Sequence, residues 1–186
     1  MYLTELNKQQ IETVYNTHMV RDFPKAELKP LRMILDAVDR GIYLCLGLFD
    51  GDEQIGISFL EKAGSDHLMD YIAIIPERRN SGAGSEMLRL LAQRLGDEGH
   101  AILEVEDPDR ASDEAEKELQ IRRLGFYKRN GCRDTGLRVE CFDVPFVILE
   151  AGSRDFDSLD EVWELYRTLY GLVLPEETLA RRVLRS

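Results

Sequence analysis

The chain has few of the residues that build disulfide-linked or metal-bound scaffolds. Its 186 residues include three cysteines, Cys45, Cys132 and Cys141, and three histidines. The odd number of cysteines and their spacing fit neither a disulfide framework nor a zinc site. No two histidines have the spacing of metal ligands, so the sequence predicts no structural metal. Cys45 lies in an apolar run, where we expect a small buried hydrophobic residue.

Long apolar stretches are also absent. No apolar run approaches the roughly 20 residues that a membrane-spanning helix needs. The first eight residues lack the apolar stretch and the small-residue cleavage site of a signal peptide. We therefore expect a cytoplasmic protein with no membrane partner.

Basic residues are in the minority. The chain has 24 Lys and Arg against 35 Asp and Glu, which gives a formal net charge of −11. Such a field repels nucleic acid at long range, so we expect no nucleic-acid partner. It would attract a cationic substrate, although an acidic surface can also serve only to keep a protein soluble.

The chain does carry a clear order of helical and strand patterns. Apolar residues recur at helical spacing in two N-terminal segments that are separated near Phe23-Pro24, and the second ends at Gly41. Three strand-like runs joined by tight turns follow. The remaining pattern alternates between helix and strand. The expected segments are helices around 11–19 and 28–38, strands at 42–49, 54–60 and 68–75, a helix from Gly82, a strand at 101–105, a helix from about Ser112 to Tyr127, and strands at about 132–141 and 143–150.

The last residues look like an appendage. Residues 151–157 have the composition of a linker, and Ser158 to Glu161 form a capping box. A helix follows with an apolar face made of Leu159, Val162, Trp163, Tyr166 and Leu169. A last short helix begins after Pro175. We expect a main domain at 1–150 and a C-terminal helical extension at 151–186, whose apolar face packs on its own domain or, as we slightly favour, forms a homodimer.

The segment from Ile72 to Ser85 carries the chemistry. A strand stops at Pro76, and a loop rich in glycine and small polar residues opens directly into an amphipathic helix. This layout points backbone N–H groups at the positive end of a helix dipole, which is where phosphate oxygens bind. Gly82 and Gly84 would permit unusual backbone angles and close approach of the anion. Arg78 and Arg79 would add positive charge.

Three kinds of phosphate loop compete for this segment. A Walker loop needs a lysine, which this loop lacks, and a Rossmann loop needs Gly-x-Gly-x-x-Gly after the first strand of the fold. The third pattern, Arg/Gln-x-x-Gly-x-Gly/Ala, is matched by Arg79-Asn80-Ser81-Gly82-Ala83-Gly84.

This loop, with the strand and Pro76 before it, resembles the acetyl-CoA loop of the GNAT acetyltransferases. The order of elements over about residues 1–150 resembles that fold as well. Two further segments do so: Phe126 to Cys132, in which Cys132 replaces the usual aromatic residue, and Leu103-Glu104-Val105. The resemblance implies an α/β (α+β) fold with a mixed, mostly antiparallel sheet, whose fourth and fifth strands splay apart, and flanking helices.

The resemblance also implies a site. Pantetheine would lie along the backbone of Ile72, Ala73 and Ile74. The pyrophosphate would lie on the loop, whose residues are Arg79, Asn80, Ser81, Gly82, Ala83, Gly84 and Ser85. An amine attacks the thioester directly in this family, so neither a metal nor a cysteine nucleophile is needed. Tyr127 occupies the position of the general acid and Glu104 that of the base.

Other carboxylates stay open as the base. Glu104 and Glu106 lie two residues apart on a strand and so share a face, and Asp70 is a further alternative. The expected function is acetyl transfer from acetyl-CoA to a primary amine, either a small amine or a peptide N-terminus. A non-catalytic acyl-CoA-binding module and an ATP-binding protein are the rival hypotheses.

Overall fold

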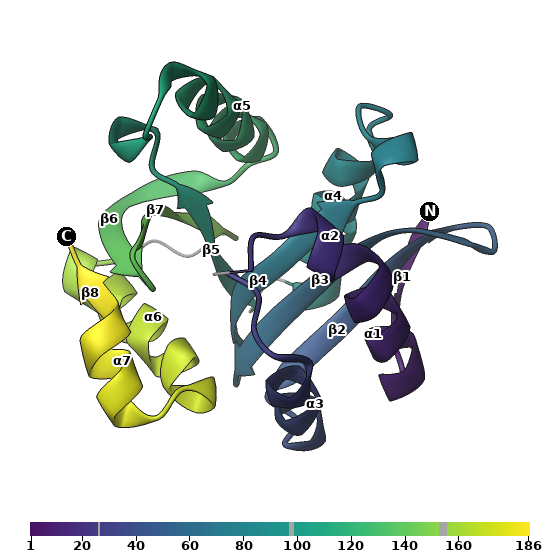
Figure 1. The fold of residues 1–186 in the computed structure, drawn as a ribbon, viewed down its shortest axis with the longest axis horizontal. Coiled ribbons are helices and arrows are strands. Elements are labelled where there is room, and N and C mark those ends of the chain that lie inside the picture. The colour runs from purple at the N-terminus through teal and green to yellow at the C-terminus, as the bar shows by residue number, and fades with distance from the viewer. Residues whose placement is uncertain (26, 97–98, 153–155) are drawn as a thin grey trace. The chain divides into compact units, whose positions relative to one another are not determined.

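The computed structural model describes residues 1–25, 27–96, 99–152 and 156–186. The chain divides into two compact units (Figure 1). The N-terminal unit comprises Met1–Lys62 and Met69–Arg94. The C-terminal unit comprises Ala63–Leu68 and Leu95–Ser186. Each unit has its own strands, helices and buried core.

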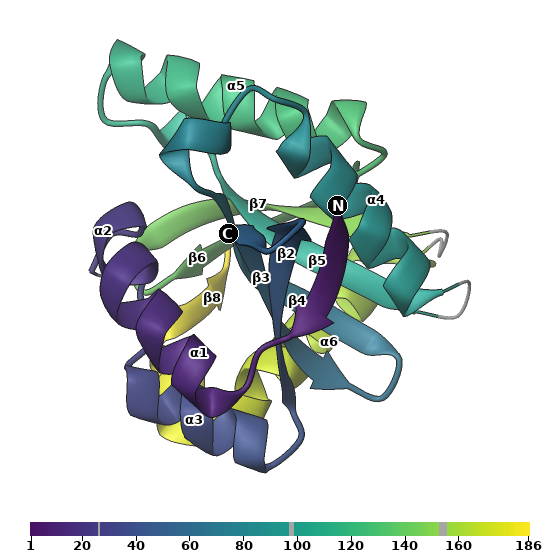
Figure 2. The ribbon, with the colours of Figure 1, turned by 90° about the vertical axis from the view of Figure 1, so that its right-hand side faces the viewer.

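The N-terminal unit is a sheet covered by helices on both faces. Its strands lie in the order β1-β2-β3-β4, and the β1–β2 and β2–β3 pairs are antiparallel. Helices α1 and α3 lie over one face and α4 over the other (Figures 1 and 2). The elements are β1 (Tyr2–Glu5), α1 (Lys8–Val14), the π-helical turn η1 (Tyr15–Met19), α2 (Val20–Asp22), α3 (Leu31–Asp39), β2 (Tyr43–Asp50), β3 (Glu53–Ala63), β4 (Asp66–Ile74), the 3-10 turn η2 (Pro76–Arg78) and α4 (Ala83–Leu95).

Two details of this unit differ from the prediction. The second helix begins at Leu31 and not at Leu28, because Pro30 stands at its N-cap position and the residue before a proline disfavours the helical region. Strand β1 was not expected. Its four residues pair with the end of β2, Tyr2 opposite Phe49 and Glu5 opposite Leu46. The break at Phe23-Pro24, the end of α3 before Gly41 and the three strands β2 to β4 are confirmed.

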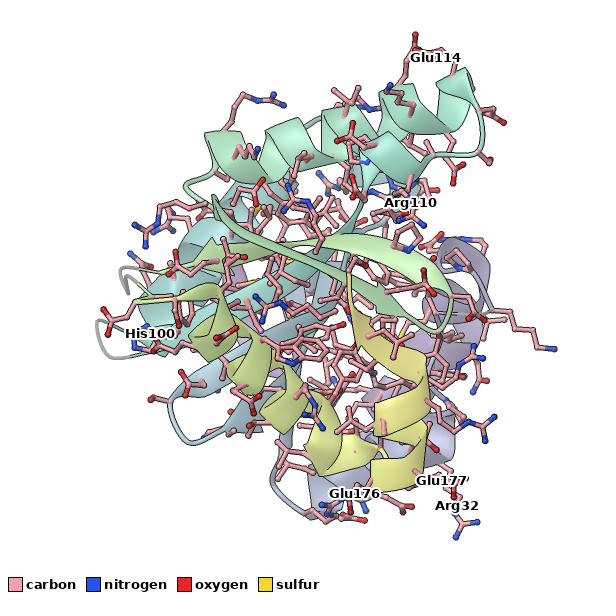
Figure 3. The ribbon with its side chains drawn as sticks, turned by 90° about the vertical axis from the view of Figure 1, so that its left-hand side faces the viewer. Arg32, His100, Arg110, Glu114, Glu176 and Glu177 are labelled. Carbon is pink, nitrogen blue, oxygen red and sulfur yellow. The ribbon has the colours of Figure 1, made fainter. Side chains whose placement is uncertain are left out.

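The C-terminal unit is an antiparallel sheet in the order β5-β7-β6-β8. Helix α5 lies over one face, and α6 and α7 over the other (Figures 1 and 3). Glu114 begins α5, and Glu176 and Glu177 begin α7, where carboxylates favour the helix dipole (Figure 3). The elements are β5 (His100–Glu106), the 3-10 turn η3 (Pro108–Arg110), α5 (Glu114–Arg129), β6 (Arg133–Cys141), β7 (Val144–Ala151), α6 (Leu159–Val173), α7 (Glu176–Arg182) and β8 (Val183–Arg185).

The C-terminal segment packs on this unit. Val162, Tyr166 and Leu169 of α6 are buried in one core with Val139 and Ile148 of the sheet. Most of the predicted apolar face is therefore covered by its own unit, although Leu159 is 41% exposed, and the homodimer stays a prediction. Strand β8, which pairs with the end of β6, was not expected.

The predicted start of α6 is confirmed in part. Ser158 caps the helix, its hydroxyl accepting from the backbone N–H of Glu161 at 3.2 Å. The Glu161 carboxylate accepts from the N–H of Asp157 at 2.9 Å, one residue before the cap, so the reciprocal bond of a capping box is displaced. Part of the predicted linker, residues 153–155, lies outside the described residues.

The expected mixed α/β fold with a mostly antiparallel sheet is confirmed. All three cysteines are free and buried, Cys45 at 4% exposure as predicted. Over the described ranges, no helix is both long and apolar enough to span a bilayer.

Candidate functional site

The loop between β4 and α4 turns sharply at two residues. Asn80 has φ of +61° and Gly82 has φ of +88°. A Cβ added at Gly82 would meet no atom within 4 Å, so glycine is needed there for its backbone angle alone. The prediction of an unusual backbone angle is confirmed for Gly82 and wrong for Gly84. Gly84 lies within the first turn of α4 and has no positive φ, because the helix has already begun at Ala83.

The loop leaves a row of backbone donors without protein acceptors. The first bond at the start of α4 runs from Glu86 N–H to the carbonyl of Gly82, at 3.0 Å. In the described part of the chain, the N–H groups from Asn80 to Ser85 donate to no protein acceptor. Helix starts always leave such donors, and the helix dipole adds positive potential at the same place. The loop therefore presents a row of backbone donors at the positive end of α4, an arrangement that is able to hold an anion.

The two arginines of the loop behave differently. Arg78 forms an ion pair with Glu53 and lies 3.7 Å from Asp50, so acidic residues of the β2–β3 turn neutralise its charge. Arg79 Nε donates to the carbonyl of Ile74 at 3.0 Å, and its Nη2 lies 3.7 Å from Asp22. The Arg79 side chain remains 51% exposed, which leaves it able to reach an anion on the loop. Two positive charges were expected to be available to an anion on the loop, and of these the charge of Arg79 remains available.

Strand β4 leads into this loop, and Ile72, Ala73 and Ile74 on it are partly buried. The carbonyl of Ile74 is occupied by Arg79. Gly56 on β3 allows the close packing here, because a Cβ at Gly56 would lie 2.8 Å from the carbonyl oxygen of Ala73.

Asp70, one of the three candidate bases, lies in a buried ionic network. Its carboxylate accepts from Lys29 Nζ at 2.7 Å and from the hydroxyl of Tyr43. Lys29 Nζ also lies 3.2 Å from Glu61. Burial lowers the pKa of Lys29, but the two carboxylates outweigh burial and hold this pKa well above its ordinary value. The arrangement ties the segment before α3 to β3 and β4.

The other two candidate bases, Glu104 and Glu106, lie in the C-terminal unit and contact different helices. Glu106 forms an ion pair with Arg123 of α5. Glu104 accepts hydrogen bonds from the hydroxyls of Tyr166 and Tyr170 of α6, the latter at 3.0 Å from both carboxylate oxygens. Hydrogen bonds to a carboxylate favour its charged form.

Tyr127 lies near the C-terminal end of α5 and is 7% exposed. Its carbonyl accepts from the N–H groups of Asn130 and Cys132, whereas its hydroxyl has no hydrogen-bond partner among the described residues. Burial raises the pKa of Tyr127 well above its ordinary value, against the opposing effect of Arg123. The hydroxyl therefore carries its proton at neutral pH.

Sequence reasoning missed the partners of these acids. Lys29, Tyr43, Tyr166 and Tyr170 had no assigned role beyond helix or strand patterns. A signal did exist for the last two, since tyrosines four residues apart lie on the same face of a helix. No group of three or more His, Cys, Asp or Glu able to hold a metal ion is found among the residues that the structure describes.

Comparison with solved structures identifies the fold. A protein of Bacteroides thetaiotaomicron assigned to the GNAT family of acetyltransferases superposes with a TM-score of 0.75 at 21% identity, over 94% of this chain and 100% of the other. The ribosomal-protein-S18-alanine N-acetyltransferase of Escherichia coli gives 0.57 at 16% identity, over 84% and 97%. The PaiA N-acetyltransferase of Thermoplasma acidophilum, solved with coenzyme A, gives 0.54 at 17%, over 81% and 98%.

No family model and no curated protein matches the sequence. The chain has the GNAT fold, as the resemblance of its loop implied.

Proposed function

We propose that this chain, a protein of the GNAT fold, transfers the acetyl group of acetyl-CoA to a primary amine. One observation carries the proposal: the row of unpaired backbone N–H groups from Asn80 to Ser85 at the positive end of α4. This row follows β4 after the short turn η2, as in the family pattern.

The residues fit an acyl-CoA. The N–H groups of Asn80 to Ser85 would hold the pyrophosphate, with Arg79 beside them. The backbone of Ile72 to Ile74 would hold pantetheine. The Ile74 carbonyl accepts a hydrogen bond from Arg79 in the structure, so pantetheine would compete with Arg79 for it. When bound, acetyl-CoA supplies a thioester whose carbonyl carbon an amine nitrogen can attack.

Two proton transfers fall to side chains. An ammonium ion must lose a proton before its nitrogen can attack, and the leaving sulfur must gain one. We assign the first to Glu104 and the second to Tyr127, whose hydroxyl keeps its proton because burial of the side chain raises its pKa. Of the two protons that the nitrogen loses, one is matched by the proton gained by sulfur and one is released to solvent. Glu106 and Asp70, both held in ion pairs, are the alternatives to Glu104.

The acceptor follows from charge. A net charge of −11 favours a cationic small amine or a peptide N-terminus over an acidic acceptor. The catalytic part would be residues 1–150, with residues 151–186 as an extension that supports Glu104 through Tyr166 and Tyr170.

Ligand-dependent thermal stability tests the cofactor. Acetyl-CoA should raise the melting temperature with the logarithm of its concentration, with about 2.7 kcal/mol of stabilisation at 100 times its Kd. Gly82→Glu should abolish this shift, because its side chain places bulk and negative charge on the anion site. Gly41→Glu is the matched control, since Gly41 also has a positive φ and open space around it but lies outside the loop.

The outcomes separate three functions. Binding of ATP without binding of coenzyme A would overturn the proposal. Release of free thiol from acetyl-CoA with members of an amine panel would identify an enzyme and its acceptor. Binding of acetyl-CoA without thiol release from any amine would favour the rival reading, a non-catalytic acyl-CoA-binding module.

A further inference from the structure

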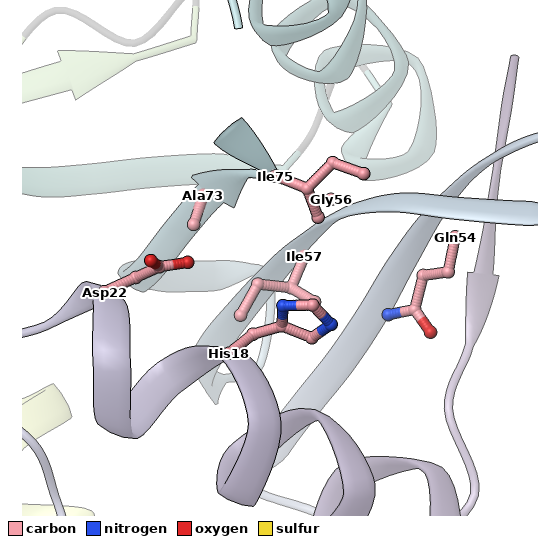
Figure 4. Close-up of a pocket in the computed structure, with 7 residues that line it drawn as sticks. All are labelled: His18, Asp22, Gln54, Gly56, Ile57, Ala73 and Ile75. Carbon is pink, nitrogen blue, oxygen red and sulfur yellow. The ribbon is translucent and has the colours of Figure 1, made fainter. Parts of the chain in front are cut away.

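Two cavities of the structure differ in size and in how their charged groups are occupied. The smaller one, of about 20 Å³, is lined by residues of η1, α2, β3 and the segment around the end of β4, and it has room for one water molecule (Figure 4). Its carboxylate, Asp22, already accepts from Arg21 through both oxygens, at 2.9 and 3.1 Å. The larger one, of about 290 Å³, lies within the C-terminal unit and approaches the size of a site for a small organic molecule.

The larger cavity lies between strand β6 and the start of α6, where β6 bulges. The pairing of β6 with β7 shifts its register between Asp134 and Arg138, and Gly136 inside this bulge has φ of +83°. Residues 133–135 of β6 and Glu150 of β7 line the cavity, and its other lining residues lie in α6 or just before it. Bulges redirect side chains and occur often beside functional sites.

One side of this cavity is apolar. Phe156, Leu159 and Val162 form it. Val162 is 1% exposed and belongs to the core, whereas Leu159 is 41% exposed. A Cβ at Gly136 would come within 3.3 Å of Leu159, so the bulge lies close against this side chain. A molecule in the cavity would therefore remove apolar surface of Leu159 from water.

The opposite side carries a buried carboxylate with one oxygen to spare. Glu150 is 2% exposed, and its Oε2 accepts from Nε and Nη2 of Arg133 at 3.0 and 2.9 Å. Its Oε1 is buried and accepts from no donor among the residues that the structure describes. A Cβ at Gly152 would lie 2.9 Å from Oε1, so glycine at that position leaves space beside this oxygen. A buried acceptor without a donor is destabilising, and it is usually satisfied.

The other charges around the cavity are already compensated. Asp134, the second carboxylate of the wall, accepts from Arg138 through both oxygens at 3.0 and 3.1 Å. Asp160 and Glu161 in the first turn of α6 set negative charge against the positive end of its dipole. Glu150 is therefore the carboxylate of the wall that suits a further donor, and a negatively charged carboxylate favours a cationic one.

We propose that this cavity binds a small organic cation, a primary ammonium carried on an apolar body. The ammonium would donate to Glu150 Oε1 while Arg133 keeps Oε2, and the body would lie against Leu159. An ammonium suits this place because it is compact and has three donors. The inference does not rest on the proposed function, because none of the residues assigned to acetyl transfer lines the cavity.

A titration with 2-phenylethylamine, followed by the amide NMR signals of the chain, tests the inference without any coenzyme. The shifted signals should gather on residues 133–135 and at the start of α6. The neutral analogue 2-phenylethanol has the same apolar body and should bind about tenfold or more weakly, because hydrogen bonds to charged groups are the stronger ones.

Two variants test the two sides of the cavity separately. Glu150→Gln keeps the shape of the side chain and removes its charge, so it should weaken the amine about tenfold or more and leave the alcohol nearly unchanged. Leu159→Ala shortens an exposed side chain and should weaken both probes by roughly three- to tenfold. Circular dichroism would confirm that each variant is folded. Should Glu150→Gln fail to fold, Leu159→Ala and the comparison of the two probes still decide the matter.

Leu184→Ala is the matched control. Leu184 of β8 is 45% exposed and does not line the cavity, so both affinities should stay as in the wild type. Equal binding of the amine and the alcohol would overturn the inference, and so would binding of neither. An amine affinity that survives Leu159→Ala, or that falls equally in Leu184→Ala, would place the amine elsewhere on the chain and overturn it as well.

Discussion

Two carboxylates of the chain, Asp70 in the N-terminal unit and Glu104 in the C-terminal unit, share one kind of partner and differ in another. Both accept a hydrogen bond from tyrosine hydroxyls, of Tyr43 and of the pair on α6. Asp70 also contacts a buried ammonium, Lys29 Nζ, at 2.7 Å. The bonds from α6 to Glu104 come from hydroxyls, and burial raises the pKa of Tyr166 well above its ordinary value, so the Tyr166 hydroxyl is neutral at physiological pH.

The difference separates a structural acid from a candidate catalytic one. A lysine that bridges two buried carboxylates fixes all three groups, since movement of one leaves a buried charge without its ionic partner. A carboxylate held by hydroxyls keeps its place when its charge changes, because a hydroxyl can also accept from a protonated acid. We therefore expect changes at the Asp70 network to act on stability and changes at Glu104 to act on rate.

The largest effect is expected from Lys29→Met. The substitution leaves Asp70 and Glu61, whose side chains are 4% and 0% exposed, without the ammonium between them. Breaking a buried pair in this way costs about 3–5 kcal/mol in the free energy of unfolding. Urea denaturation would measure it, with Lys8→Met as control.

Lys8 pairs with Asp39 on the surface, where both side chains are more than half exposed, so its removal should change little. A Lys29→Met variant as stable as the Lys8→Met variant would show that the buried carboxylates do not depend on the lysine.

A smaller effect is expected from Tyr170→Phe. The lost hydroxyl lies 3.0 Å from both oxygens of Glu104, and a hydrogen bond to a charged group contributes about 1.5–3 kcal/mol. Denaturation followed by near-UV circular dichroism would report the weaker docking of α6. Tyr2→Phe removes an exposed hydroxyl that donates to the carbonyl of Gly51, and it should leave the stability nearly unchanged. Equal stabilities of the two variants would mean that apolar packing alone holds α6.

The sequence predicted the parts of this molecule that depend on local pattern. Strands β2 to β4, the loop and the start of α4 follow from alternation, glycine and proline, which act over a few residues. Strands β1 and β8 were not predicted, because three or four residues at a sheet edge are too few to show an alternating pattern. Their pairing with β2 and β6 defines them. The π-helical turn had no signal in the sequence either.

The partners of the candidate site residues were not predicted for a different reason. Lys29 and Asp70 are 41 residues apart, and Tyr166 and Glu104 are 62 residues apart. Such contacts are set by how the elements pack, and periodicity says which face a residue lies on but not what that face meets. Arg78 shows the same limit. Its positive charge was expected to be available on the loop, but Arg78 forms an ion pair with Glu53.

The smallest effect on stability, and the sharpest test of the comparison, is expected from Glu104→Gln. The amide oxygen of glutamine still accepts from Tyr166 and Tyr170, so unfolding should cost less than in Tyr170→Phe. The rate should fall nonetheless, because an amide cannot take a proton from the ammonium, and general base catalysis contributes about 10²–10⁴-fold.

Tyr127→Phe tests the proposed general acid in the same way. Loss of the hydroxyl should lower kcat by about tenfold or more with acetyl-CoA affinity nearly unchanged. Rates of thiol release across pH, with the acceptor found in the amine panel, would measure both variants. An unchanged kcat in Glu104→Gln would make Glu104 a docking group for α6 and pass the role of base to Glu106 or Asp70, and an unchanged kcat in Tyr127→Phe would make Tyr127 a core residue.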